Sequence, residues 1–405
     1  MSEHSISVTL SLGNGPYQRK LPETLARQGM LRRVFSFGEG LEIFDVNGHG
    51  ELKRVKRFAS YRAATRVLWA AWRRLPATRL SRLPVIGTTW LADQQVSKWI
   101  SGGTIFHGWT ATCLVSLRSA KEQGLRTLVE NASFHPREWQ REVLAECRQF
   151  GVDPRDCGSV LPEKLVDRRE REFEMCDRIV VPSEVAKRSF QGFPYSDKVE
   201  VVLPGVDHAF FSPGERTERP ETFRVCYLGR VELAKGVGYL LQAWKQLNLR
   251  NAELLLMGEC RPEMVTLLNE YGKPNVRLLG MQSVESAAKL YRQSSVLVQP
   301  SVHEGLSMVL LEAMASGLPV IATNRTGAED CVTHGSEGWV VPPRSAESLS
   351  EAILWCYQNR ELSESMGQKA RTKIEGAFTL EHYNARIIAL YGHLVSSNNK
   401  VGIWR

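Results

Sequence analysis

The sequence predicts an α/β protein with two domains, each built on a parallel sheet that is covered by helices. The chain has 405 residues, which is more than one hydrophobic core usually organises. Apolar runs bounded by turn residues alternate with helical patterns along nearly the whole chain, which is the order that βαβ units produce. A stretch with Pro and Gly, followed by polar residues, interrupts this order at 204–222 and is typical of an interdomain linker. We therefore expect domains at 1–205 and 223–377, a linker at 206–222 and a separate C-terminal segment at 378–405.

Eleven apolar runs are predicted to be strands, at residues 7–12, 34–37, 104–106, 125–129, 178–181, 199–203, 224–228, 253–257, 276–279, 296–298 and 319–322. The runs at 178–181 and 296–298 are each followed closely by Pro and Ser, and a Ser after a strand is a natural cap for the next helix. This short repeat indicates two similar α/β domains. Because ligands of such sheets bind at the carboxyl ends of strands, we expect the domains to face each other across a cleft.

The charge is distributed unevenly along the chain. Residues 1–200 hold 31 Lys and Arg against 23 Asp and Glu, whereas the remainder holds 21 of each. The whole net charge of +8 therefore lies in the first half, which indicates an anionic partner or surface for that half.

The strongest concentration of positive charge is the stretch 53–82, which holds ten Lys and Arg and no acid. Apolar and aromatic residues recur in it at helical spacing, namely Phe58, Tyr61, Leu68, Trp69, Trp72 and Leu75. The stretch is therefore predicted to be a basic amphipathic helix. It would bind an anionic membrane surface, or pack on the sheet with its basic face in solvent, and both alternatives stay open. Nucleic acid is a third alternative for this stretch. No recognition motif accompanies the charge, so we expect no nucleic-acid partner.

The rest of the composition favours an ordinary cytoplasmic protein. The eight Cys contain no C-x-x-C pair, so we expect buried free thiols, which suit a reducing cytosol. No apolar run reaches the roughly 18 residues of a membrane span. The N-terminus lacks the basic and then apolar pattern of a secretion signal. The expected location is the cytoplasm, with the inner face of the membrane as the alternative if the basic stretch binds lipid.

The most informative segment for chemistry is 303–322. Glu304 and the Gly that follows it precede an apolar stretch that contains Glu312, and Gly-Leu-Pro then leads into a strand. This order predicts a carboxylate at a helix N-terminus, where anions bind, beside the exposed amides of Gly305, Leu306 and Ser307. Glu312 should lie about two turns further on. Two acids that only stabilise the helix are the alternative.

A second segment carries two cations. The strand at 224–228 ends in Gly229, Arg230 and Lys235 follow five residues apart, and a helix begins near Val237. Such a loop suits a diphosphate, because Arg can bind it bidentately and Lys adds a point charge. Solvated surface cations are the alternative.

Together, these segments resemble the retaining nucleotide-sugar glycosyltransferases of glycosyltransferase family 4, which carry two Glu eight residues apart and a Gly-Arg…Lys-Gly loop. The resemblance covers about residues 175–345. It implies a GT-B fold, with an N-terminal acceptor domain, a C-terminal nucleotide-sugar domain, a terminal helix that returns to the first domain, and retention of the anomeric configuration. It further implies that Glu304 faces the sugar, Glu312 binds the ribose, and Arg230 and Lys235 hold the diphosphate.

Further donor contacts are expected where two apolar strands end, at Gly258 and at Gly280 with Met281. Gly at these points lets the backbone approach a base or ribose, although a plain turn is the alternative. After the first strand, a flexible loop suited to the acceptor contains Gly13, Asn14 and Gly15. Its spacing departs from the Gly-Gly pattern of many relatives.

Two histidines in the first half are candidates for a catalytic position. His107 follows the strand at 104–106, and His135 lies in a stretch that looks like the Glu-Arg-Gly-Ser-x-His loop of one branch of the family. Relatives often place a His near the transferred sugar in this region. His107, His135 or neither has this role, and a structural His is the alternative for each.

No metal motif is present, since the chain lacks D-x-D, H-E-x-x-H and any His/Cys cluster. We therefore expect no cofactor, with the leaving diphosphate neutralised by Arg, Lys and helix amides. The expected function is transfer of a sugar from a nucleotide-sugar donor to a sugar or lipid-linked acceptor, in polysaccharide or glycolipid synthesis. The alternatives are a non-catalytic sugar-nucleotide-binding or scaffold protein and a nicotinamide dehydrogenase. The last is disfavoured because no G-x-G-x-x-G follows the first strand.

Overall fold

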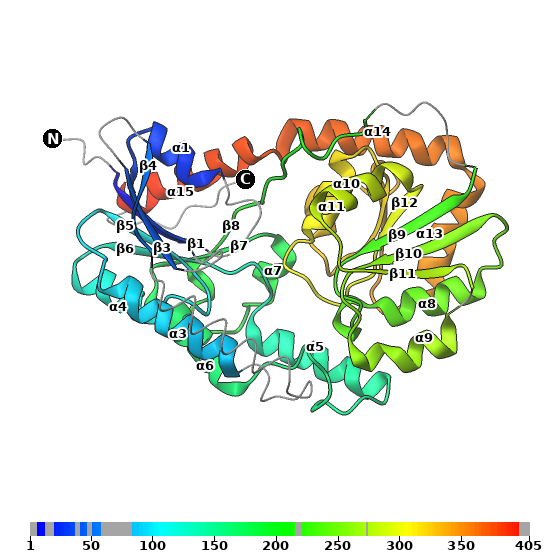
Figure 1. The fold of residues 1–405 in the computed structure, drawn as a ribbon, viewed down its shortest axis with the longest axis horizontal. Helices are drawn as coiled ribbons and strands as arrows, with labels where there is room; N and C mark the ends of the chain where they lie inside the picture. The colour runs from blue at the N-terminus through cyan, green and yellow to red at the C-terminus, as the bar shows by residue number, and fades with distance from the viewer. Residues whose placement is uncertain are drawn as a thin grey trace.

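The computed structural model describes residues 6–12, 20–36, 41–46, 51–57, 83–214, 221–272 and 274–396. It confirms the predicted fold class, because two α/β domains lie side by side and each has a largely parallel sheet between helices (Figure 1).

The first sheet has eight described strands in the order β4-β3-β2-β1-β5-β6-β7-β8. Their bounds are β1 Val8–Leu12, β2 Leu31–Ser36, β3 Glu42–Val46, β4 Leu52–Arg57, β5 Ile105–Trp109, β6 Arg126–Glu130, β7 Arg178–Val181 and β8 Val199–Val201. Strand β3 pairs antiparallel with both β2 and β4, and all the other described pairs of this sheet are parallel.

The second sheet has six described strands, all parallel, in the order β11-β10-β9-β12-β13-β14. They are β9 Phe223–Leu228, β10 Ala252–Met257, β11 Val276–Gly280, β12 Val296–Gln299, β13 Val320–Thr323 and β14 Gly338–Val341. All eleven predicted strands are present with boundaries shifted by a few residues, whereas β3, β4 and β14 were not predicted.

The prediction of a basic helix from residue 53 is wrong for 53–57, which form most of strand β4. Antiparallel pairing places Lys53 opposite Asp45, and Arg54 Nη1 lies 3.2 Å from Glu42 Oε1. Acids on β3 thus give the basic residues a cross-strand partner, which helical periodicity does not reveal. Residues 58–82 lie outside the described residues.

Helices cover both faces of each sheet (Figure 1). In the first half they are α1 Leu21–Arg27, α3 Leu83–Ser97, α4 Leu114–Glu122, α5 Pro136–Gln149, α6 Glu163–Met175 and α7 Glu184–Arg188. The second half has α8 Val237–Gln246, α9 Val265–Tyr271, α10 Val284–Gln293, α11 Met308–Ala315, α12 Ala328–Cys331, α13 Ala346–Gln358, α14 Arg360–Ala377 and α15 Leu380–Ser396.

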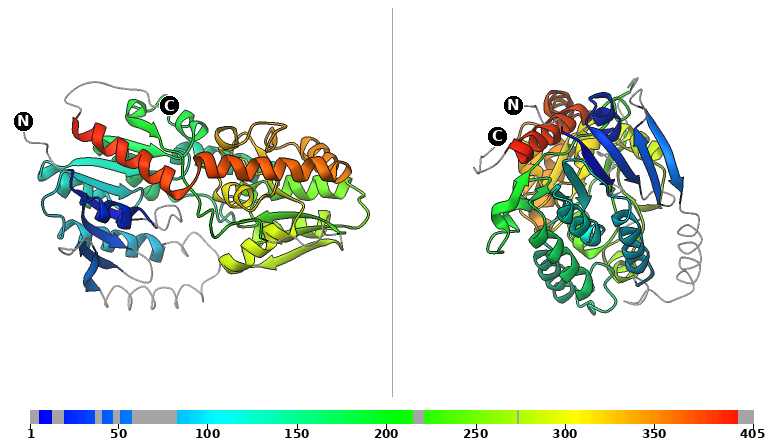
Figure 2. Two further views of the ribbon diagram at one scale, coloured as in Figure 1. Left: turned by 90° about the horizontal axis from the view of Figure 1, so that it is seen from above. Right: turned by 90° about the vertical axis from the view of Figure 1, so that its left-hand side faces the viewer.

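Helix α15 carries the chain back to the first sheet. Viewed from above, α14 and α15 run end to end across both domains (Figure 2). Tyr383, Ile387 and Tyr391 of α15 are buried in one core with Leu10 of β1. At the crossing point a Cβ on Gly205 would lie 2.1 Å from the Thr379 carbonyl oxygen, so the two connections pass too closely for any larger residue.

Helix α5 lies in the first half of the chain but packs on the second domain. Its residues Val143 and Cys147 share a buried core with Val237 and Leu240 of α8. Arg344 Nε lies 2.6 Å from Oε1 of the buried Glu146 of α5. The two domains are therefore held together by an apolar contact as well as by the two chain connections.

Candidate active site

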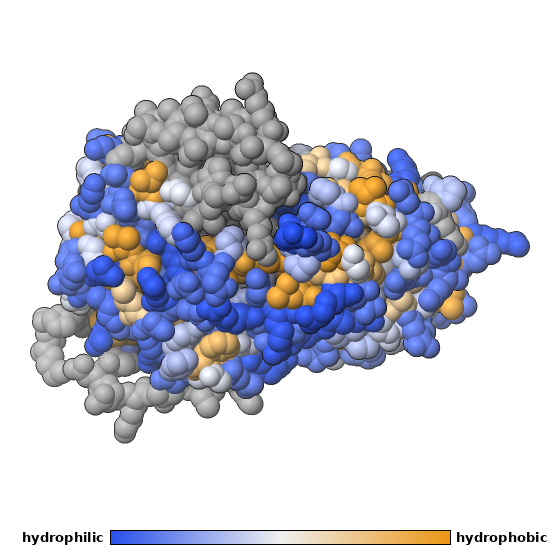
Figure 3. All heavy atoms as spheres, turned by 90° about the horizontal axis from the view of Figure 1, so that it is seen from below, coloured by the Kyte–Doolittle hydropathy of each residue, from blue (hydrophilic) through white to orange (hydrophobic). Residues whose placement is uncertain are grey.

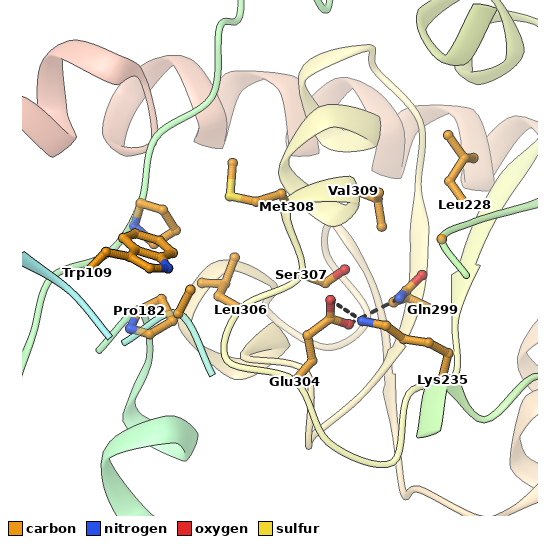
Figure 4. Close-up of a pocket in the computed structure, with 13 residues that line it drawn as sticks. Trp109, Pro182, Leu228, Lys235, Gln299, Glu304, Leu306, Ser307, Met308 and Val309 are labelled. Carbon is orange, nitrogen blue, oxygen red and sulfur yellow. Dashed lines mark hydrogen bonds and ion pairs between the residues drawn. The ribbon is translucent and has the colours of Figure 1, made fainter. Parts of the chain in front are cut away.

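Glu304 lies in the loop between β12 and α11, at the carboxyl end of the second sheet. Lys235 ends a short 3₁₀ turn after β9, and its Nζ lies 2.6 Å from Glu304 Oε1 (Figure 4). Gln299 Nε2 and Ser301 Oγ donate to Glu304 Oε2 at 3.2 and 3.1 Å. The fold thus brings together two predicted site residues that are 69 positions apart in the sequence.

The surroundings of Glu304 keep it ionised. Burial raises the pKa of its carboxyl, but the Lys235 ammonium and the hydrogen bonds from Gln299 and Ser301 outweigh burial and lower the pKa below its ordinary value. A carboxylate accepts hydrogen bonds from hydroxyl groups but has no proton to donate. The side chains of Lys235 and Glu304 remain 14% and 20% exposed, so a ligand can reach both.

A cavity of about 430 Å³ surrounds this ion pair. From the first half of the chain, the described residues that line it are Trp109, Ala132, Pro182 and Pro204, and none of these is charged. The second domain contributes the ion pair and mostly apolar neighbours, namely Leu228, Gly229, Lys235, Gln299, Glu304, Leu306, Ser307, Met308 and Val309. The volume is within the range of small-molecule sites, roughly 300–1,000 Å³. Both domains therefore build one site, charged on one side and apolar on the other.

Helix α11 begins at Met308, four residues later than Glu304. The Ser307 amide, which we expected to be exposed, instead donates to the Thr326 carbonyl oxygen at 3.1 Å. The next amides, of Met308 and Val309, are in the first turn and have no acceptor within the helix. Both residues line the cavity, so the N-terminus of α11 lies beside it. Its first free amides follow Ser307, the last of the three residues predicted to supply them.

Gly305 is a point of contact between the domains. A Cβ at this position would lie 2.2 Å from the Ala132 carbonyl oxygen and 2.9 Å from Pro182 Cγ. Ser183, which caps α7 by accepting from the Ala186 amide, also donates its hydroxyl to the Gly305 carbonyl. The absence of a side chain at Gly305 thus lets the Glu304 loop touch the first domain.

Ser183 and Ser301 occupy matching places after their strands but have different roles. Ser183 caps the next helix, as predicted. Ser301 lies seven residues before α11 and bonds Glu304 instead, so the predicted cap is wrong at this position.

Arg230 is not among the residues that line the cavity. Its side chain is 44% exposed, and Nη2 is 3.1 Å from the buried Glu232 Oε1. The neighbouring Gly229 does line the cavity, with a left-handed φ of 136°. Of the two predicted diphosphate cations, the structure therefore brings Lys235 to the cavity and pairs Arg230 elsewhere.

The predicted donor contacts at the ends of β10 and β11 do not line the cavity. A Cβ on Gly258 would lie 1.9 Å from the Gly229 carbonyl oxygen, so this Gly allows two strand ends to approach each other. Met281 is 76% exposed after β11. Glu312 lies in the second turn of α11, where its Oε2 accepts from the Tyr291 hydroxyl at 2.8 Å.

His107 is buried beneath helix α15. Its Nδ1 lies 2.7 Å from the Tyr391 hydroxyl, and its Nε2 lies 3.2 Å from Glu130 Oε2. Tyr383 of the same helix donates to Glu130 at 3.1 Å. This network ties the returning helix to β5 and β6, and it favours the structural alternative for His107.

His135 is also buried away from the cavity. Its Nε2 lies 2.7 Å from the Tyr195 hydroxyl, its ring stacks on Phe193 with centroids 3.5 Å apart, and its Nδ1 accepts the Arg137 amide at the start of α5. Burial, and then the nearby Arg137, lowers its pKa to about 3, so the ring is neutral. The packing favours a structural role here too. The predicted acceptor loop of Gly13, Asn14 and Gly15 lies outside the described residues.

Several cavity residues were missed by the sequence analysis, and two of them carry polar groups. Gln299 ends β12 and Trp109 ends β5, so both occupy the carboxyl ends of parallel strands, where ligands bind. That position was a usable signal. Among the residues that the structure describes, no cluster of His, Cys, Asp and Glu is arranged to hold a metal ion.

Two facing Rossmann-like domains with a cavity between them define the GT-B fold. The sucrose-phosphate synthase of Thermosynechococcus elongatus shares it, with a TM-score of 0.70 and 20% identity over 96% of this chain and 99% of that one. The HepE protein of Anabaena, solved with UDP-glucose, has a TM-score of 0.63 and 14% identity over 96% of this chain and 99% of that one. The predicted GT-B architecture is therefore confirmed.

Sequence comparison narrows this class for the second domain. Residues 211–373, which include Lys235 and Glu304, match the family described as "Glycosyl transferases group 1". The D-inositol 3-phosphate glycosyltransferase of Pseudarthrobacter chlorophenolicus is 30% identical over 223 residues, or 49% of this chain and 53% of that protein. The matched region thus spans about half the length of this relative. These matches support the coarser part of the prediction, a relationship to glycosyltransferases, and place it in group 1.

Proposed function

We propose that this protein is a retaining, metal-independent glycosyltransferase of family 4, which moves a sugar from a nucleotide-sugar donor to an acceptor hydroxyl. One observation carries the proposal: the Lys235–Glu304 pair lies in a cavity between two GT-B domains, beside the first turn of α11. The match of residues 211–373 to group 1 glycosyltransferases supports it, as does the UDP-glucose bound to a protein of the same fold.

The proposed chemistry follows from the charges around the cavity. Lys235 and the amides of Met308 and Val309 would bind the diphosphate and stabilise the negative charge that grows on it as the sugar leaves. Glu304, held as a carboxylate, would accept hydrogen bonds from the sugar and offset positive charge at the reacting carbon. The acceptor hydroxyl would enter from the wall that the first domain supplies. Lys235 and the helix amides would replace a metal as the source of positive charge.

Donor binding and turnover test this proposal. Thermal unfolding is measured with UDP-, GDP- and ADP-glucose and with the free diphosphates, each with and without EDTA. A ligand at 100 times its Kd should stabilise the folded state by about 2.7 kcal/mol, and EDTA should not change this. Release of UDP, GDP or ADP from the stabilising donor then separates an enzyme from a non-catalytic binding protein. No stabilisation by any nucleotide would contradict the proposal.

We further propose that the first half of the protein meets an anionic membrane surface and takes a lipid-linked acceptor there. Strand β4 is an edge strand, and its described residues Lys53, Arg54 and Lys56 are exposed. No helix within the described ranges is long and apolar enough to cross a bilayer. The described residues on the face in Figure 3 are mostly hydrophilic, with hydrophobic ones in small separate groups, so attachment would depend on charge.

Vesicle cosedimentation tests this surface. The protein should sediment with anionic vesicles at low salt, and much less at high salt or with neutral vesicles, because polybasic attraction is screened. Equal absence from both vesicle types would contradict the membrane proposal and leave the transferase proposal intact.

A further inference from the structure

The wall of the cavity opposite the ion pair is formed by Trp109, the last residue of β5. Figure 4 shows its ring at the other end of the cavity from Lys235 and Glu304, with Leu306 and Met308 between them. The proposed function gives this ring no specific role, since it assigns the nucleotide and the diphosphate to the second domain.

The turn that follows Trp109 is held in an unusual conformation. Ala111 has a φ of 72°, in the left-handed region that a residue with a Cβ seldom adopts. Such a conformation is unfavourable and persists only where the surroundings fix it. A Cβ on the preceding Gly108 would lie 2.7 Å from Cys113 Cβ, so the turn folds back tightly onto the strand.

Buried charges fix this turn. Glu172 of α6 is fully buried, and its two carboxylate oxygens accept the amides of Ala111 at 2.5 Å and Cys113 at 3.0 Å. Arg168, one turn earlier, donates Nε to the Ala111 carbonyl oxygen at 3.2 Å and forms an ion pair with the buried Asp93 of α3. Two side chains with little or no exposure, Glu172 and Arg168, therefore bind the turn after Trp109 directly, and Asp93 holds Arg168 in place.

Among the residues that the structure describes, those that line the cavity around Trp109 carry no charge. Its described neighbours from the first half of the chain are Ala132, Pro182 and Pro204. The cation of the cavity, Lys235, is at the other end and is paired with Glu304. A phosphate on the acceptor would find no described partner at this end, whereas the C–H face of a neutral sugar ring packs well on an indole.

We propose that Trp109 determines acceptor specificity, by taking the apolar face of an uncharged sugar ring or glycoside. The proposal rests on the proposed glycosyltransferase function. It predicts a neutral acceptor, in contrast to the phosphate-bearing compound in the name of the matched D-inositol 3-phosphate glycosyltransferase.

The test is direct binding of paired probes to the full-length protein in the presence of UDP. The neutral probes are the octyl β-glycosides of glucose, galactose, mannose and N-acetylglucosamine, and the charged probes are the 6-phosphates of the same sugars. Ligand-observed NMR should detect at least one neutral glycoside with at least about tenfold higher affinity than its phosphate partner. Trp109→Ala should weaken this binding about tenfold, whereas Trp109→Phe should keep most of it because it keeps an aromatic face.

Two controls separate this proposal from the function on which it rests. Trp355→Phe changes a partly buried ring on α13 in the second domain, and it should leave glycoside binding unchanged. The affinity for UDP should be equal in all variants. If UDP binds but no neutral glycoside does, or if Trp109→Ala binds glycosides as tightly as the parent, the acceptor proposal is overturned. If no nucleoside diphosphate binds, it is the glycosyltransferase proposal that fails.

Discussion

Replacing His303 by Phe should make the protein more resistant to acid. His303 precedes Glu304 and is buried between two aromatic residues of the first domain, with ring centroids 5.8 Å from Phe134 and 4.2 Å from Trp139. Neither ring nitrogen has a hydrogen-bond partner within the part of the chain that the structure describes. The charged groups that face it are Lys235, Glu142 and Glu304.

The expected magnitude follows from the pKa of the ring. Burial, with a smaller effect of Lys235, lowers the pKa of His303 from 6.5 to about 4. The folded protein therefore keeps a neutral ring, while the unfolded chain takes up a proton below pH 6.5. Above pH 6.5 the difference in pKa does not reduce the free energy of unfolding. As the pH falls from 6.5 toward 4, proton uptake by the unfolded chain reduces it progressively. From pH 8 to pH 5 the pH falls about 1.5 units below the pKa of the unfolded ring. The free energy of unfolding should therefore fall by about 2 kcal/mol.

Urea-induced unfolding, followed by tryptophan fluorescence at pH 8 and pH 5, measures this loss. The loss of unfolding free energy between the two pH values should be about 2 kcal/mol smaller in His303→Phe than in the parent. At pH 8 the variant should be at least as stable, because a ring without nitrogen atoms leaves no unsatisfied polar atom. His334→Phe, at an exposed histidine of the same domain, is the control and should lose as much as the parent. Equal losses in the parent and His303→Phe would refute the reasoning.

Three further predictions concern the site. Lys235→Ala should weaken nucleoside-diphosphate binding by about 1.5–3 kcal/mol, and Arg230→Ala by less because its guanidinium is paired with Glu232 and does not line the cavity; calorimetry that shows equal losses would contradict this assignment. Glu304→Gln should fold normally but turn over far more slowly, since it removes the charge beside the reacting sugar, and a near-parental rate would argue against that role. Glu312→Gln should raise the KM for the donor with kcat unchanged, as expected for a ground-state contact, and a pure loss of kcat would exclude it.

The sequence predicted those parts of the fold that depend on local pattern. Strands buried on both faces, such as β9 and β12, read as short apolar runs between turn residues. Strand β4 does not, because its exposed basic residues gain stability from acids on β3, a partner that only the fold supplies. Strand β14, at the edge of its sheet, was also missed, although its apolar residues Trp339, Val340 and Val341 form a run as short as that of β12.

For the site, the sequence predicted single residues but not how they are arranged. Glu304 and Lys235 were found from their motifs, but their contact spans 69 residues and depends on the order of β9 and β12 in the sheet. Arg230 shows that a motif does not fix the partner of a side chain. It belongs to the same motif as Lys235, yet it pairs with the buried Glu232, two residues further along. Trp109 belongs to no motif, and its place in the cavity wall becomes visible only when the fold brings the two domains together.

The loop that carries Glu304 has two functions that cannot be separated. Glu304 pairs with Lys235 inside the second domain, while Gly305, the next residue, touches Ala132 and Pro182 of the first. His303, on the other side, packs against Phe134 and Trp139. Any movement that separates the domains must therefore pull on the residues flanking Glu304. A ligand that changes the distance between the domains should therefore also change the position of the Glu304 carboxylate relative to Lys235, through these three consecutive residues.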